Sequence, residues 1–380
     1  MKVEQFEFTR TGGWSPTLAL DEPRSAVQLV LLFGDVDLAS DGEGRSLIRR
    51  AFPRAHLFGC TSAGEILGAQ VRNETLALTA VTLEHTQLAT SRARIESLDD
   101  SFAAGQEVIR QLPQNGLRHV FVLSEGLRVY GGDLVKGISS GLPPGVSASG
   151  GFAADRWLFR ATHVWCDSEP TSSSVIALGF YGDRLRVGLS VTGGWRPFGL
   201  DRLITRSQRN VVYEFDGRPA LALYKEYLGE HASGLPASGH LFPLEICYPE
   251  RKSRVLRALL AVDEKEQSIT YASEVPQGSH ARFMMGQIED LVGGAHKAAK
   301  ANLENLGRPR PQLSLLVSCA GRREILAQRV EEEVESIRDI FGEQTGMTGF
   351  YSYGEIGPPE GSCLPELHNE TISITSMVED

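Results

Sequence analysis

Two octets near opposite ends of the chain have almost the same sequence: GCTSAGEI at residues 59–66 and GFYSYGEI at residues 349–356. They agree at five of eight positions, and each is followed by the tripeptide Asn-Glu-Thr, at residues 73–75 and 369–371. Each tripeptide runs into a stretch, LALTAV or ISITSM, that alternates apolar and small polar side chains. This period of two is typical of a half-buried β-strand. Duplication of one folding unit explains these matches better than chance similarity between glycine-rich turns.

The match extends upstream of both octets. QLVLLFGD at 28–35 and QLSLLVSC at 312–319 are apolar runs of strand length, and a segment of helical character follows each of them. The two helical segments are 41–52 and 322–341. Each end of the chain therefore contains a strand, a helix, a strand leading into Gly-Glu-Ile and a strand preceded by Asn-Glu-Thr. We predict that 28–81 and 312–377 fold as equivalent units related by a pseudo-twofold or a similar operation.

A fainter copy of the unit lies between the two clear ones. It runs from HVFVLSEG at 119–126 through VSASGGFAAD at 146–155 to SSSVIALGF at 172–180. The sequence agreement is weaker here than between the two ends. Two interpretations therefore stay open, a third copy of the unit and a chance likeness.

Strands and helices alternate along the chain without a long low-complexity linker. This alternation predicts an α/β protein in which mixed sheets are covered by helices. Turn-forming residues at 193–197 indicate a seam between two halves. We predict two domains, 20–212 and 213–378, with internally duplicated strand–helix–strand–strand units. The strongest helix is predicted over 281–306, where apolar residues recur at the spacing of one helical face.

Composition excludes several classes of function. The net charge is −10 and no block of Lys or Arg stands out, which disfavours a nucleic-acid-binding protein. No apolar run approaches the length of a membrane span and the N-terminus lacks the features of a signal peptide, so we expect a cytoplasmic protein without a membrane segment. The five cysteines are scattered and form no Cys-x-x-Cys, which disfavours a disulfide framework and a structural zinc site.

The repeated glutamates Glu65 and Glu355 are candidates for chemistry. Two carboxylates brought together by duplication could form a general acid/base pair or bind a cationic group. Alternatively, each accepts hydrogen bonds that fix its own turn, and we favour this interpretation because both lie in the same local sequence. Cys60 replaces the Phe350 of the other octet. A catalytic thiol would need a base and an electropositive environment, so a buried, inert thiol is the better interpretation.

Two of the nine histidines are candidate metal ligands. His240 lies in LPASGHLFPL, between apolar residues and turn-forming Pro and Gly. His368 directly precedes the second Asn-Glu-Thr, where the first copy has Arg72. In the setting of His240, an imidazole could ligate a metal ion with one nitrogen while a carbonyl holds the other, and both histidines could instead be structural.

Many short motifs together resemble the FIST family, and they occur in the order that the family has them. These are GCTSAGEI, GGFAAD, GFYG, GGWRPFG, VVYEFDGRPALALYKEYLG, LPASGHLFPL, GFYSYGEIGP and LHNETISIT. The resemblance covers residues 20–378. It implies paired N- and C-terminal sensory domains of bacterial signal transduction. One branch of the family consists of stand-alone, haem-binding nitric oxide sensors that work with histidine kinases or cyclic-di-GMP enzymes.

This resemblance implies an intracellular sensor that binds haem, detects nitric oxide and regulates a separate histidine kinase or cyclic-di-GMP enzyme. Because the chain has neither Cys-x-x-Cys-His nor Cys-Pro, the cofactor would be non-covalent haem b with a histidine ligand, His240 or alternatively His368. Glu355, Tyr351, Glu65 and Cys60 complete the residues expected to contact the ligand.

Other functions stay open. The sensor could bind a non-haem metabolite such as an amino acid. An enzyme built on Glu65, Glu355 and Cys60 is a further alternative, although the sequence contains no recognised catalytic constellation. The sequence does not decide the ligand, the partner protein or the oligomeric state, for which a homodimer is one option.

Overall fold

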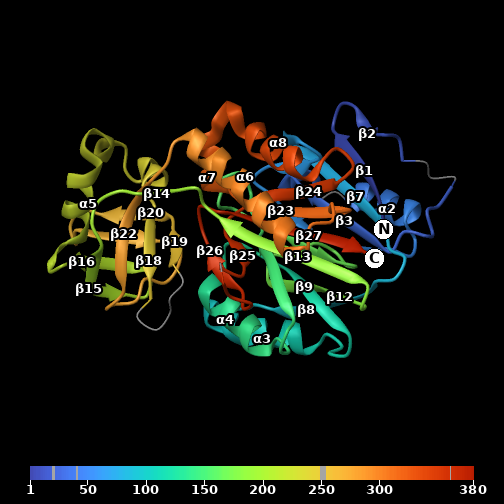
Figure 1. The fold of residues 1–380 in the computed structure, drawn as a ribbon, viewed down its shortest axis with the longest axis horizontal. Coiled ribbons are helices and arrows are strands. Elements are labelled where there is room, and N and C mark those ends of the chain that lie inside the picture. The colour runs from blue at the N-terminus through green and yellow to red at the C-terminus, as the bar shows by residue number, and fades with distance from the viewer. Residues whose placement is uncertain (19–21, 40–41, 249–253, 360) are drawn as a thin grey trace.

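The structure is a computed structural model that describes residues 1–18, 22–39, 42–248, 254–359 and 361–380. It consists of a larger lobe, which contains both termini, and a smaller lobe built from elements within residues 196–285 (Figure 1). Mixed sheets with covering helices confirm the predicted α/β class. The predicted start of the first domain, residue 20, lies outside the described residues. Within these ranges, the helices are all too short or too polar to cross a membrane.

The larger lobe contains three similar units, and unit 1 spans residues 1–82. Its central strand pairs in parallel with β4 and antiparallel with β7. Buried apolar side chains fill this central strand, which explains the continuous apolar run in the sequence. The elements of unit 1 are β1 (Lys2–Thr9), β2 (Gly13–Ser15), β3 (Leu29–Gly34), α1 (Val36–Ala39), α2 (Gly42–Ala51), β4 (His56–Thr61), β5 (Glu65–Leu67), β6 (Gln70–Arg72) and β7 (Thr75–Thr82).

Unit 2 spans residues 87–181 and has the same pairing. Its central strand β9 is parallel to β10 and antiparallel to β12. The third copy of the unit is therefore real, although it lacks the shared octet. Its elements are β8 (Gln87–Arg94), η1 (Leu98–Asp100), α3 (Ser101–Arg110), β9 (Leu117–Ser124), α4 (Gly131–Gly141), β10 (Ser147–Phe152), β11 (Val164–Cys166) and β12 (Ser174–Tyr181).

Unit 3 comprises residues 185–192 and 288–379. Its central strand β23 is parallel to β24 and antiparallel to β27, as the duplicated sequence predicts. The helix predicted over 322–341 is divided into α7, a short 3-10 turn and α8. The elements are β13 (Leu185–Thr192), α6 (Ile288–Asn305), β23 (Leu313–Cys319), α7 (Ala320–Leu326), η4 (Ala327–Arg329), α8 (Val330–Phe341), β24 (Gly346–Ser352), β25 (Glu355–Gly357), β26 (Glu366–His368) and β27 (Ile372–Glu379).

The three units exchange strands in a ring. β5 of unit 1 pairs with β24 of unit 3, β25 of unit 3 pairs with β10 of unit 2, and β11 of unit 2 pairs with β4 of unit 1. Each of the three six-stranded sheets thus contains strands from two units. The predicted equivalence of 28–81 and 312–377 is therefore confirmed, and both are members of a three-part ring that also contains unit 2.

Glycine is required in each strand that pairs with an exchanged strand. A Cβ atom on Gly59, Gly150 or Gly349 would lie 1.8 Å from a carbonyl oxygen of the neighbouring parallel strand. No side chain fits there, which explains why each octet begins with glycine. The core between the sheets draws on all three units; for example, Phe33 of unit 1 stacks on Phe350 of unit 3 with ring centroids 4.9 Å apart.

The smaller lobe is an insertion in unit 3, between β13 and α6. The predicted boundary at 212/213 falls inside β16 of this lobe. The helix predicted over 281–306 begins only at Ile288, because the residues before it form β22 and pair with β18. The elements of the lobe are β14 (Arg196–Pro197), β15 (Arg202–Gln208), β16 (Val211–Phe215), β17 (Arg218–Pro219), α5 (Ala220–Leu228), η2 (Gly229–Gly234), η3 (Ala237–Leu241), β18 (Leu244–Cys247), β19 (Arg254–Arg257), β20 (Leu259–Asp263), β21 (Ser268–Tyr271) and β22 (His280–Met285).

Candidate ligand-binding site

The loops that follow β4, β10 and β24 meet at the carboxyl ends of these parallel strands. Three backbone hydrogen bonds link the loops in a ring: Ala63 N–H to Tyr351 O at 2.8 Å, Tyr353 N–H to Phe152 O at 3.2 Å and Ala154 N–H to Thr61 O at 3.0 Å. Ligands of α/β proteins commonly bind beyond the carboxyl ends of the strands, where loops from different units converge. A ligand site of this protein is therefore expected at this edge of the fold.

Residues 155–161, which follow β10, form what we call the central loop. The buried carboxylate of Asp155 accepts hydrogen bonds from the backbone N–H groups of Phe159, Arg160 and Ala161 at 2.7–3.0 Å. The hydroxyl of Tyr353 donates to Asp155 at 2.6 Å and accepts the N–H of Trp157 at 2.9 Å. Asp155 thus holds the loop in a fixed shape and joins it to unit 3.

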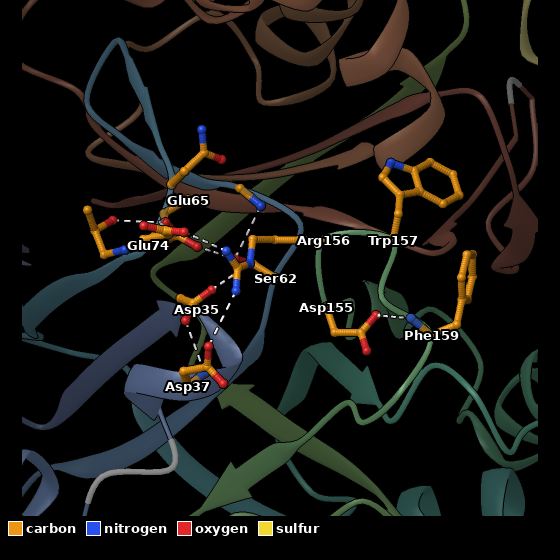
Figure 2. Close-up of polar contacts among 12 residues, drawn as sticks. Asp35, Asp37, Ser62, Glu65, Glu74, Asp155, Arg156, Trp157 and Phe159 are labelled. Atoms are coloured by element: carbon orange, nitrogen blue, oxygen red, sulfur yellow. Dashed lines mark hydrogen bonds and ion pairs between the residues drawn. The ribbon is translucent and has the colours of Figure 1, made fainter.

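Arg156 points from the central loop into a group of acidic side chains, which we call the Arg156 cluster (Figure 2). Its guanidinium lies 2.8 Å from Asp35, 3.4 Å from Asp37 and 2.7 Å from Glu74. Asp35 is buried, whereas the side chains of Asp37 and Glu74 are 65% and 67% exposed. Three carboxylates thus surround one cation, and the outer two face solvent.

Trp157 points the other way, toward His240 of the smaller lobe. The two rings have centroids 5.2 Å apart, and the indole N–H donates to Glu324 at 3.1 Å. Phe159 and Tyr353 stack beside Trp157 with centroids 5.1 Å apart. These aromatic side chains, with His240, Glu324 and Glu370, form what we call the His240 cluster.

His240 is held by a buried carboxylate. Its Nδ1 lies 3.0 Å from Oε1 of Glu370, whose side chain is fully buried. The other carboxylate oxygen of Glu370 has no hydrogen-bond partner within the described residues. Burial alone would lower the pKa of His240, but the hydrogen bond and charge of Glu370, with the charge of Glu324, raise the pKa above its ordinary value. The imidazole is 19% exposed, so its edge is within reach of a ligand.

The repeated glutamates have the same surroundings in units 1 and 3. Glu65 accepts hydrogen bonds from the hydroxyls of Ser62 and Thr75, and Glu355 accepts them from Ser352 and Thr371. Burial raises the pKa of Glu65 to about 7 and that of Glu355 to about 8, against the lowering effect of these bonds. Each carboxyl thus fastens its exchanged strand to the start of β7 or β27. Their geometry fits the structural role and does not join them into one pair.

Three other predicted site residues are enclosed elsewhere. The Tyr351 hydroxyl is fully buried and donates to Glu333 at 2.8 Å. Cys60 lies in the core between the sheets, and burial raises the pKa of its thiol. His368 is buried in β26 with Nε2 3.0 Å from the carbonyl of Gly357, and burial lowers its pKa to about 4. Of the two candidate iron ligands, only His240 has an accessible ring.

Sequence reasoning missed Asp155, Arg156, Trp157 and Glu370. The repeat could have pointed to Glu370, because it is the glutamate of the second Asn-Glu-Thr. Its partner His240, however, lies 130 residues away in the sequence. Trp157 and Arg156 follow the GGFAAD motif without a repeat to mark them. The described residues contain no group of three His, Cys, Asp or Glu side chains arranged to hold a metal ion. A haem needs only one protein ligand, and an imidazole whose Nδ1 is fixed by a carboxylate fits that requirement.

Comparison with known proteins decides the family. The profile of the FIST N domain matches residues 28–218, and that of the FIST C domain matches residues 220–358. The chain belongs to the FIST family. FIST domains are sensory domains of signalling proteins and generally bind small ligands. The central loop lies within the FIST N match and His240 within the FIST C match, so the His240 cluster combines residues from both.

Two relatives of this FIST protein are described as uncharacterized proteins of Mycobacterium tuberculosis. The proteins MT0897 and Rv0628c of Mycobacterium tuberculosis are 26% and 27% identical to it over 248 and 249 residues. Each match covers 62% of this chain and 62% of the relative. A solved structure of cyanuric acid hydrolase from A. caulinodans aligns with 100% of this chain and 98% of its own, at a TM-score of 0.38 and 9% identity. A second cyanuric acid hydrolase structure aligns at 0.36 and 9%. Structural similarity and sequence identity this low do not indicate an activity for this chain.

Proposed function

We propose that this FIST protein is a bacterial sensor that binds a small ligand at the His240 cluster. The observation that carries the proposal is the pairing of His240 with Glu370, a buried carboxylate that fixes Nδ1 and leaves the ring edge accessible. Trp157, Phe159 and Tyr353 surround it with aromatic rings against which a planar ligand could pack. The cluster thus combines three aromatic rings with His240, Glu324 and Glu370, so a small ligand could make both apolar and polar contacts there.

We propose non-covalent haem b as the ligand and nitric oxide as its signal. Bound haem would supply an iron that takes up a diatomic gas. His240 would hold the iron through Nε2, and Glu370 would fix the orientation of the ring and make the imidazole a stronger ligand. Regulation would pass to a separate histidine kinase or cyclic-di-GMP enzyme, since a sensor must present its bound and free states to a partner with different affinities. We propose that the protein is not itself an enzyme, because Glu65, Glu355 and Cys60 are each engaged or buried.

The test is reconstitution with haemin, followed by its Soret absorption. We expect the wild type and His368→Ala to bind haemin in equal stoichiometry and His240→Ala to lose at least tenfold in affinity, with unchanged circular dichroism. His280→Ala, which changes an exposed histidine of β22, is the matched control. Equal haemin binding by His240→Ala and the wild type would remove His240 as the ligand. A wild type that never binds haemin would remove haem altogether.

A second candidate ligand is an amino acid, favoured by the Arg156 cluster. Opposite charges lie side by side there, as recognition of a carboxylate and an ammonium group requires. Arg156 is already engaged by three carboxylates, so a ligand carboxylate would have to compete with them. Calorimetric titration with the twenty amino acids tests this candidate, and binding that Arg156→Ala abolishes would favour it over haem.

A further inference from the structure

The central loop contributes residues to both the Arg156 cluster and the His240 cluster. Arg156 and Trp157 are neighbours in sequence, yet Figure 2 shows Arg156 extending toward Asp35, Asp37 and Glu74 while Trp157 points away from them. Trp157 instead packs on His240. Any displacement of the loop backbone at these two residues therefore acts on both clusters at once.

The backbone of the central loop is strained. Arg156, Trp157 and Phe159 have φ angles of 56°, 64° and 50°, in the left-handed region that side chains other than glycine rarely adopt. Such residues persist only where surrounding contacts hold them, and they are concentrated in switch regions. Here the holding contacts are those of Asp155 and Tyr353, together with the side-chain contacts of Arg156 and Trp157. If either Arg156 or Trp157 loses its side-chain contacts, the loop can relax, and this relaxation favours loss of the contacts of the other residue.

We propose that the central loop is a relay: a ligand that enters the His240 cluster displaces Trp157 and thereby releases Arg156 from Asp35, Asp37 and Glu74. The statement that a ligand displaces Trp157 rests on the proposed function, whereas the coupling between Trp157 and Arg156 does not. Release of the guanidinium leaves three carboxylates without their cation, two of them largely exposed. The surface at Asp37 and Glu74 then becomes more negative and favours a partner with basic side chains.

Thermodynamic linkage predicts in which direction a mutation of Arg156 changes the affinity for the ligand. If ligand binding must break the contacts of Arg156, then removal of those contacts by mutation lowers the cost of binding. Arg156→Ala should therefore bind haemin more tightly than the wild type, about fivefold or more, the lower end of typical allosteric coupling. Arg206→Ala removes an exposed arginine that pairs with Glu214 in the smaller lobe, and it should leave the affinity unchanged. Unchanged or weaker binding by Arg156→Ala would overturn the relay while leaving haem binding intact.

Hydrogen exchange measured by mass spectrometry tests the coupling without any ligand. Trp157→Ala should accelerate exchange of backbone amides at 35–39 and 72–76, which lie around the carboxylates and not around His240. Haemin bound to the wild type should have the same effect, and Arg206→Ala should have none. Acceleration confined to 155–161 in Trp157→Ala overturns the relay. If no variant binds haemin, the proposed ligand fails, and the Trp157→Ala result alone decides the coupling.

Discussion

Glu74 and Glu370 occupy the same position of the repeated Asn-Glu-Thr motif, and each presents its carboxylate to a cationic or titratable side chain from another part of the fold. Both have φ near 55°, at 56° and 55°. Glu74 pairs with Arg156 at 2.7 Å and is largely exposed, whereas Glu370 pairs with His240 at 3.0 Å and is fully buried. One duplicated position therefore contributes to both clusters of the candidate site, in two different dielectric environments.

Glu370→Gln should lower the pKa of His240. The substitution keeps the shape of the side chain but removes the charge of Glu370, so the lowering effect of burial is opposed by less negative charge, mainly that of Glu324. A raised pKa in the folded state stabilises the protein at low pH, and this contribution is lost as pH rises through that pKa. Nuclear magnetic resonance of the imidazole C–H groups during a pH titration measures the effect. Glu214→Gln, which changes a glutamate paired with Arg206 in the smaller lobe, is the control and should leave the His240 titration in place. An unchanged pKa in Glu370→Gln would contradict the prediction.

Stability should fall between pH 5 and pH 8 because of Glu65 and Glu355. Their pKa values in the folded protein are raised to about 7 and about 8, so the folded state keeps protons that the unfolded chain releases near pH 4.5. The unfolding free energy then decreases with rising pH, by up to about 1.4 kcal/mol per pH unit for each carboxyl. Urea unfolding at pH 5.5 and 8.0 measures this slope. The double variant Glu65→Gln/Glu355→Gln should flatten it, and an equally steep slope in that variant would refute the assignment.

Gly349→Ala should destabilise the fold severely. The new Cβ would lie 1.8 Å from the carbonyl oxygen of Leu316 in the neighbouring strand, and two backbones would have to separate. We expect a loss of about 3 kcal/mol or more in the unfolding free energy. Gly293→Ala is the control: the added Cβ of this helical position meets nothing within 4 Å beyond its own helix backbone and chain neighbours, and the variant should be more stable by roughly 0.5–1 kcal/mol. Comparable unfolding midpoints for the two variants would show that position 349, between its paired strands, tolerates a side chain.

Native Cys60 should not react with a thiol reagent. It is fully buried in the core between the sheets, and burial raises the pKa of its thiol, so little thiolate forms. Cys363 is exposed and should be modified quickly under the same conditions. Mass spectrometry of the peptides after labelling in buffer and in urea distinguishes them. Fast modification of Cys60 in the folded protein would revive the alternative of an enzyme with a thiol nucleophile.

The sequence by itself determined the repeated unit and much of its interior. Apolar runs, period-two strands and the shared Gly-x-x-Ser-x-Gly-Glu-Ile are local patterns, since each reports the burial and hydrogen bonding of residues close together in the chain. The hydrogen bonds that Glu65 receives from Ser62 and Thr75 also stay within ten residues. These features could be predicted because the groups that interact are near one another before the chain folds.

The tertiary structure alone decided how the units combine and where the candidate site lies. Strand exchange joins the two clear copies and the third copy that the sequence left open into a ring of three. The smaller lobe interrupts unit 3 where the sequence indicated only a seam. His240 and Glu370 are 130 residues apart, and Asp155 and Tyr353 are 198 apart. No local pattern selects such partners, because which side chains meet depends on how all the sheets close around a shared core, and that closure is a property of the whole chain.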